Sequence, residues 1–272
     1  YADGGHLSDF TNKAFELLET IGWEHAPAIL PSRTGQLTSA QGAEESSSWR
    51  APLDLIPLLD TLNQETPALL DAGKDKTWQG EEKLAELLLQ SDPRAVLAAY
   101  REAMTDGATP QQLAKSTAYA AGLRLARFSR ANEIGDWVTA LHTFSYCHAV
   151  HVSLKRCGDA ALLPALFQGA MSIYQDRFLN VPPRRLPQAD STLPEGEAEL
   201  RALFLAALDG REEQDRPAQI VQRYLDLGFP PAPLFDTLTL AVVREDADFH
   251  TIQMVEAGIA EYLNWGPSAP GN

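Results

Sequence analysis

Residues 136–158 read DWVTALHTFSYCHAVHVSLKRCG, and this stretch is one of the clearest helix signals in the chain. It begins with Asp136, an acid suited to a helix N-cap, and Lys155 and Arg156 stand close to its other end. These cations interact favourably with the negative, C-terminal end of the helix dipole. Gly158 can adopt the left-handed conformation that ends many helices. The pattern therefore predicts a helix over about 136–156.

Two further helix starts are as well defined. Asp92 and Thr109 are capping residues, and each is followed by proline, which suits the first helical position. Gln112 completes a capping box with Thr109. Alternation of β-branched residues, which would indicate strands, never lasts more than about four residues. We therefore expect an all-α, single multi-helix globular domain over 1–272.

The remaining helices follow the same periodicity. The first, over about 8–21, has an apolar stripe of Phe10, Ala14, Phe15, Leu17, Leu18 and Ile21. Others are expected at about 53–62, 64–72, 81–89, 160–178, 197–208, 218–227, 233–243 and 249–265. The polar stretch 31–49 is expected to be a loop or a weak helix. The segment 181–194 carries four prolines and is expected to be a loop at which two lobes could divide.

Composition limits the classes of function. The chain has 272 residues, a formal charge of −15 and 44% hydrophobic residues, so it can bury a sizeable core. This charge opposes binding to nucleic acid and to anionic membranes, both of which need Lys and Arg. Cys147 and Cys157 belong to one predicted helix, about 15 Å apart along its axis, too far for a disulfide. We expect a soluble cytoplasmic protein.

Histidine is the chemical signal that remains, because P-loop, GxGxxG, CxxC, HExxH and GxSxG motifs are absent from the sequence. Three of the six histidines, His142, His148 and His151, lie within ten residues. At 100° per residue, His142 lies about 120° to 180° away from the other two. The three therefore cannot share one metal ion, although His148 and His151 could hold one jointly.

Two other histidines lie on separate elements. His250 stands at the start of the last predicted helix, where the helix dipole favours the neutral, metal-binding form of the imidazole. His25 follows the end of the first predicted helix, near Trp23. Each of these histidines could equally pack or lie in solvent, so the prediction of a site depends on their coming together.

Aromatic residues accompany these histidines along the chain. Trp23, Trp137 and Phe144 could line an apolar cofactor or substrate pocket, and Tyr146 could act in catalysis. Packing in the protein core accounts for the same residues.

The histidine segments resemble those of the questin oxidase-like family. The resemblance lies in Ala140-Leu-His142-Thr-Phe-Ser-Tyr-Cys-His148-Ala-Val, Asp248-Phe-His250-Thr-Ile-Gln-Met-Val-Glu-Ala and Gly22-Trp-Glu-His25-Ala-Pro. The segment beginning Tyr174-Gln-Asp-Arg-Phe is similar to a bacterial branch sometimes fused to a Rieske domain. The sequence departs from the family at Thr143, where proline is usual, and at Tyr146, where a second histidine is usual.

This resemblance implies Baeyer–Villiger-type oxidation of an aromatic or polycyclic small molecule. We expect His25, His142 and His250 to meet in a buried pocket and bind iron or haem iron. His142, His250 and Tyr146 are the expected catalytic residues. A separate Rieske-type or other electron donor would be needed, because no Rieske ligand pairs occur.

Two alternatives stay open. In a metal-free version, the histidines would act as general bases towards a bound phenol or carbonyl. In a non-catalytic version, the chain would be a helical small-ligand-binding or protein-interaction domain in which the histidines pack.

Overall fold

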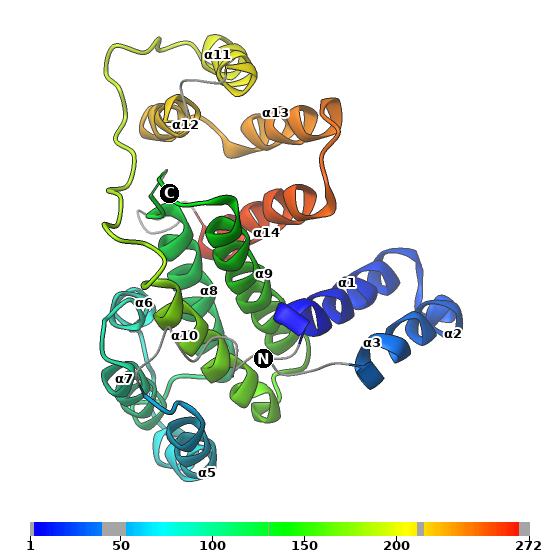
Figure 1. Ribbon diagram of the computed structural model, residues 1–272, viewed down its shortest axis with the longest axis vertical. Coiled ribbons are helices and arrows are strands. Elements are labelled where there is room, and N and C mark those ends of the chain that lie inside the picture. The colour runs from blue at the N-terminus through cyan, green and yellow to red at the C-terminus, as the bar shows by residue number, and fades with distance from the viewer. Residues whose placement is uncertain (1–2, 40–52, 130, 211–214, 267–272) are drawn as a thin grey trace. The chain divides into compact units, whose positions relative to one another are not determined.

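A computed structural model describes residues 3–39, 53–129, 131–210 and 215–266 (Figure 1). Every regular element in these ranges is helical, and they contain no strand, which confirms the all-α prediction. The chain forms two compact units, 1–184 and 185–272. The division between them falls inside the proline-rich segment 181–194.

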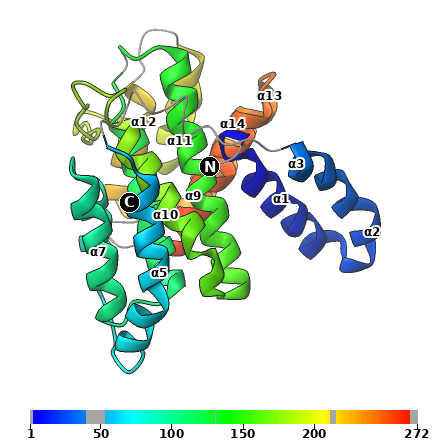
Figure 2. The same cartoon turned by 60° about the horizontal axis from the view of Figure 1, so that its bottom comes forward.

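The body of the first unit is a set of packed helices. They are α5 (Ile56–Gly73), α6 (Glu81–Leu88), α7 (Pro93–Thr105), α8 (Pro110–Ala126), α9 (Ile134–Cys157) and α10 (Leu163–Asp176). Helix α8 packs against α6, α9 and α10, and Figure 2 shows α5 lying beside α7. The Tyr100 ring meets the Phe167 ring at 5.1 Å, and its hydroxyl lies 2.6 Å from that of Thr117. The largest fully buried side chains of this unit include residues from all six of these helices, and they form its core.

Helices α8 and α9 approach each other closely because α8 presents small residues. Its buried positions include Ala114, Ala118 and Ala121. A Cβ atom at Gly122 would lie 3.4 Å from Phe144 of α9. The Phe144 ring therefore fills the space that the small residues of α8 leave.

The local capping predictions are confirmed with one correction. The Thr109 hydroxyl accepts from the backbone N–H of Gln112 at 3.2 Å, as a capping box requires. Gly158 closes α9 at φ 65°. The correction concerns Asp136, which is not the N-cap of α9 but its third residue. Glu133 is the N-cap, and its backbone N–H donates to the Asp136 carboxylate at 3.3 Å.

Residues 3–39 form an arm of short and long helices, here called the N-terminal arm. It contains η1 (Asp3–Gly5), α1 (His6–Ile21), η2 (Trp23–His25), α2 (Ala26–Ile29), η3 (Leu30–Arg33) and α3 (Thr34–Ser39). Helix α1 and η1 pack against α9. The predicted polar stretch 31–49 is thus helical as far as Ser39, and its positions from 40 onwards lie outside the described residues.

The buried face of α1 differs from the predicted apolar stripe. Its buried residues are Asp9, Asn12, Ala14 and Leu18, so two of the four are polar. Leu17 and Ile21 were expected inside, but they are 46% and 44% exposed. The correction has a physical cause, because α9 offers polar and histidine side chains to α1 instead of an apolar groove.

The second unit has its own core. It contains α11 (Glu197–Asp209), α12 (Arg216–Asp226), α13 (Pro231–Arg244) and α14 (Phe249–Trp265). Its buried cluster consists of Leu193, Leu200, Phe204, Ile220, Tyr224 and Leu234. The Tyr224 hydroxyl donates to the Pro230 carbonyl at 2.7 Å, and burial raises the pKa of Tyr224 to about 12.

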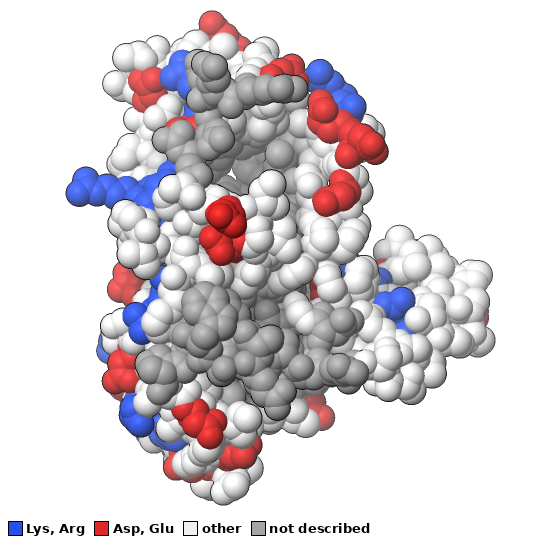
Figure 3. Space-filling model, in the orientation of Figure 1, with Lys and Arg blue, Asp and Glu red and all other residues white. Residues whose placement is uncertain are grey.

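The charged side chains and the two cysteines can now be placed on the structure. In the part of the chain that the structure describes, charged side chains are scattered over the face in Figure 3. Among the described helices, none is both long and apolar enough to cross a membrane. Cys147 is buried and Cys157 is exposed, and both lie on α9, as predicted.

Candidate metal centre at the α1–α9 contact

Two histidines from different helices meet where α1 begins. His6 is the first residue of α1, and His142 lies in the first half of α9. Their ring centroids are 4.5 Å apart with an interplanar angle of 75°. A ring nitrogen of each lies within 4.8 Å of the other, and both residues are partly exposed. Two imidazole nitrogens bound to one ion lie within roughly 4.2 Å of each other, so a small side-chain rotation would complete the pair.

The backbone before α1 brings His6 to this place. Gly4 and Gly5 have φ values of 61° and 94°, a left-handed conformation that favours glycine. A Cβ atom at Gly4 would lie 3.9 Å from Nδ1 of His142. The chain therefore passes directly beside the His142 ring and then turns into α1.

A buried carboxylate stands next to His6. Asp9 follows His6 by three residues, so both project from the same side of α1. The Asp9 side chain is almost fully buried, and its Oδ2 lies 3.9 Å from Nδ1 of His6. The Phe10 ring lies 5.2 Å from the His6 ring.

A second polar contact lies further along the same two helices. A carboxylate oxygen of Glu16 lies within 4.8 Å of a ring nitrogen of His148, which is buried. Glu16 also accepts from the Asn12 amide at 2.7 Å and from the Lys13 ammonium at 2.8 Å. The Lys13 charge opposes a bound cation, so this contact is better explained as polar packing than as a metal site.

A third contact lies towards the end of α9. Arg156 donates to the Glu19 carboxylate at 2.5 Å and to the Asn12 amide oxygen at 3.2 Å. Its guanidinium also lies 5.4 Å from the centre of the Phe15 ring. The hydrogen bond from Arg156 lowers the pKa of Glu19.

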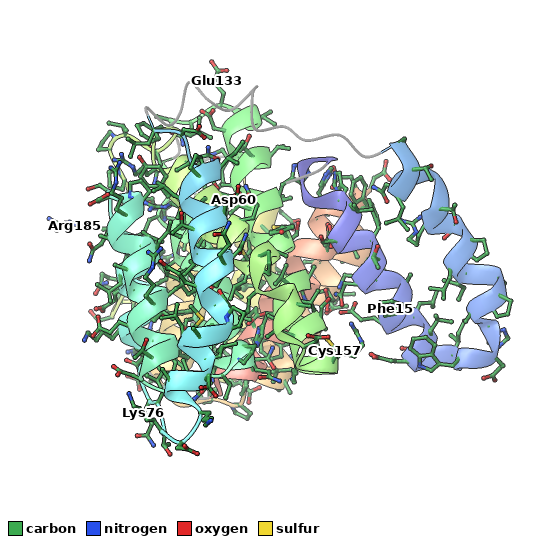
Figure 4. The ribbon with its side chains drawn as sticks, turned by 90° about the horizontal axis from the view of Figure 1, so that it is seen from below. Phe15, Asp60, Lys76, Glu133, Cys157 and Arg185 are labelled. Atoms are coloured by element: carbon green, nitrogen blue, oxygen red, sulfur yellow. The ribbon has the colours of Figure 1, made fainter. Side chains whose placement is uncertain are left out.

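These contacts show that α1 and α9 run in the same direction. His6, Glu16 and Glu19 of α1 meet positions that increase in the same order along α9. Figure 4 shows α1 beside α9, with Phe15 towards the end of α9 that carries Cys157. The interface therefore contains a series of polar contacts along the two helices. The contact between His6 and His142 is the one nearest the start of α1.

His25 does not lie beside His142, where the sequence analysis predicted it. His6 begins α1, while His25 follows its end, and a helix of 16 residues is about 24 Å long. His25 is also exposed. The correction is that His6, and not His25, lies beside His142. The prediction missed His6 because it began the helix at residue 8 and left the preceding glycines out of account.

His148 and His151 are both buried, with 1% and 4% exposure. His148 meets Glu16 and not the His142 ring, as the angular separation on α9 predicted. His151 belongs to none of the groups of three metal-binding side chains found among the described residues. A metal shared by His148 and His151 therefore has no third ligand there.

The aromatic residues named from the sequence pack in separate places. The Tyr146 hydroxyl donates to the Ala165 carbonyl of α10 at 2.9 Å, which ties α9 to α10. Phe144 packs on α8, and the Trp137 ring lies 5.4 Å from the buried ring of Phe128. Trp23 is 52% exposed. Core packing thus accounts for Phe144 and Tyr146.

His250 belongs to the second unit, at the second position of α14, so its placement at a helix start is confirmed. Asp248 is the N-cap, and its carboxylate accepts from the backbone N–H of Thr251 at 3.0 Å. That hydrogen bond is the main cause of a lowered pKa of Asp248. The His250 Nδ1 lies 3.5 Å from Asp248 Oδ2, and its ring lies 3.8 Å from that of Phe249.

Comparison with known proteins returned no relative. No family model, no curated protein and no solved structure matches this chain. The likeness to questin oxidase-like proteins therefore stays a prediction from short histidine segments.

Proposed function

We propose that this protein binds a transition metal ion through His6 and His142 and uses it to oxidise an aromatic or polycyclic small molecule with O₂. The observation that carries the proposal is the contact of two imidazole rings from α1 and α9. Neutral imidazole is a common ligand of iron, copper and zinc. The oxidative part of the proposal rests on the family resemblance.

The donor set suits a metal ion with open positions. Two partly exposed imidazoles leave coordination sites for substrate or O₂, as an oxygen-dependent centre requires. His250 remains the third imidazole of the proposal, on the strength of the sequence resemblance alone.

Non-haem iron fits the pair better than a haem held between the two rings. Opposed imidazoles on a haem iron place their nitrogens alone roughly 4 Å apart, and their ring centres clearly further. The His6 and His142 centroids are 4.5 Å apart, and one ring turns its edge to the other. This arrangement leaves no room for a macrocycle between them.

In this proposal the role of the protein's own residues is to bind the metal ion and to leave it accessible to a substrate. Bound iron would supply the activation of O₂. His6 and His142 would hold the ion at the edge of the α1–α9 interface, where partial exposure admits a substrate. An external donor of electrons, Rieske-type or other, would be required.

Metal content tests the proposal directly. Protein purified without chelator, and then loaded with Fe(II) under anaerobic conditions, should hold about one ion per chain. His6→Ala and His142→Ala should lose it, and His250→Ala tests the third ligand. His25→Ala is the matched control, because His25 is exposed and lies at the other end of α1. A folded wild-type protein that binds neither Fe(II) nor Co(II) would contradict the proposal.

Turnover is the second readout. The Fe(II)-loaded protein, with a chemical reductant, should consume O₂ when a polycyclic phenol is added. Loss of O₂ uptake in His142→Ala but not in His25→Ala would support a metal-dependent oxidation. Uptake that is equal with and without metal would favour the general-base version instead.

A second candidate function has one observation in its favour. Leu17, Ile21 and Trp23 expose between 44% and 52% of their surface on the N-terminal arm. Exposed apolar residues gathered in this way are typical of interaction surfaces. In a non-catalytic interaction protein, His142→Ala would change stability alone.

A further inference from the structure

We infer that Asp9 is a positioning residue of this metal centre, whose carboxylate orients the His6 ring so that Nε2 faces the ion. The inference rests on the proposed metal site at His6 and His142. It adds a residue that none of the histidine motifs indicated.

Burial is the first observation. Asp9 is 1% exposed, although a carboxylate is costly to remove from water unless charge or hydrogen bonds compensate it. A negative charge in the first turn of α1 interacts favourably with the helix dipole, but an exposed acid would stabilise the helix equally well. The burial of Asp9 therefore indicates that its carboxylate acts on groups close to it, and His6 is one of them.

The position of Asp9 relative to the ring is the second observation. Its Oδ2 lies 3.9 Å from Nδ1 of His6, so the carboxylate lies on the Nδ1 side of the imidazole. Metal-binding histidines almost always donate their other ring N–H to a carboxylate, a carbonyl or water. A rotation of the ring that shortens this distance would fix Nδ1 as the donor and leave Nε2 for the metal.

Electrostatics gives the third argument. His6 is the first residue of α1, where the partial positive charge of the helix end disfavours a bound cation. The Asp9 carboxylate offsets that charge within the same turn. Glu16, further along this side of α1, cannot serve in the same way because Lys13 pairs with it.

The neighbouring ring supports a fixed orientation. Phe10 lies 5.2 Å from His6, and the ring of His142 lies 4.5 Å away. With aromatic neighbours at these distances, the imidazole has few free rotamers. Asp9 then determines which of its nitrogens donates.

Co(II) titration of the full chain tests the inference, because Co(II) reports its ligands through its visible spectrum. The variants are Asp9→Asn, Asp9→Glu and the control Asn12→Ala, since Asn12 is equally buried one turn further along α1. Asp9→Asn should weaken Co(II) binding about 10- to 100-fold and shift the visible bands. Asp9→Glu should recover part of the affinity. Asn12→Ala should lower the unfolding temperature and leave the Co(II) spectrum unchanged.

The outcomes separate the inference from the proposed function. If wild-type protein binds Co(II) and Asp9→Asn binds it with the same affinity and spectrum, only the role of Asp9 is overturned. If Asn12→Ala weakens binding as much as Asp9→Asn does, Asp9 acts only through the packing of α1. If folded wild-type protein binds no Co(II), the metal centre itself is wrong, and the role of Asp9 falls with it.

Discussion

The imidazole of His6 turns its edge to the imidazole of His142 at a centroid distance of 4.5 Å, and this contact joins the first residue of α1 to α9. The rest of the α1–α9 interface is polar and buries few apolar side chains on α1. Burial of apolar area is the main source of helix packing energy, so α1 should be weakly held. A metal ion between the two rings would then link the N-terminal arm to the body.

Metal binding should therefore slow hydrogen exchange in α1. Ligation of His6 and His142 by one ion stabilises only the docked arm, so its backbone amides should exchange more slowly when Zn²⁺ is added. Hydrogen–deuterium exchange with mass spectrometry measures this effect. The amides of α7 serve as the internal control, and His142→Ala should abolish the difference. Equal protection of α7 would indicate general stabilisation instead.

Acid should loosen the other end of α1. The hydrogen bond from Arg156 holds the pKa of Glu19 below its ordinary value of 4.5. A depressed folded-state pKa means that the pair stabilises docking above pH 4.5 and that this contribution is lost as the pH falls further. Because Glu19 is largely exposed, the effect should stay under about 1 kcal/mol. Exchange of α1 amides between pH 6 and 3.5 measures it, and Arg156→Gln should flatten the response.

Tyr146→Phe should affect stability and leave metal binding intact. The variant removes the hydrogen bond from the hydroxyl to the Ala165 carbonyl, at a cost of about 1 kcal/mol. Urea denaturation and Co(II) titration of the same sample separate the two effects. A large loss of Co(II) affinity would instead support the role at the site that was predicted for Tyr146 from the sequence.

Phe144→Ala should destabilise the first unit strongly. Its ring is 7% exposed and packs on the small residues of α8, so truncation should cost about 3–5 kcal/mol. Trp23→Ala provides the contrast, because the 52% exposed Trp23 ring should contribute under about 1 kcal/mol. Thermal unfolding of both variants measures the difference. A cofactor-lining Trp23 would show itself as altered ligand binding without altered stability.

The sequence predicted those features that local chemistry controls. The capping box at Thr109, the N-cap at Asp92 and the glycine closure at Gly158 each depend on a few neighbouring residues, and all three are present. The loop 181–194 was placed by its prolines, and it contains the boundary of the two units.

The candidate site was less predictable because it depends on which helix faces meet. The stripe of α1 was assigned from apolar periodicity, but its buried positions include Asp9 and Asn12, and Arg156 of α9 donates to Asn12. His6 lies before the predicted start of α1, and the two left-handed glycines before it carry the chain past His142. A single histidine after Gly4 and Gly5, with an acid three residues later, was the signal available in the sequence.

The two cysteines of α9 differ in accessibility, and this difference allows one of them to be labelled selectively. Cys147 is buried, whereas Cys157 is exposed and adjoins Arg156, the residue that contacts Glu19 and Asn12. Under native conditions a maleimide dye should therefore attach to Cys157 alone. Its fluorescence would register separation of the two helices in real time, without any engineered cysteine.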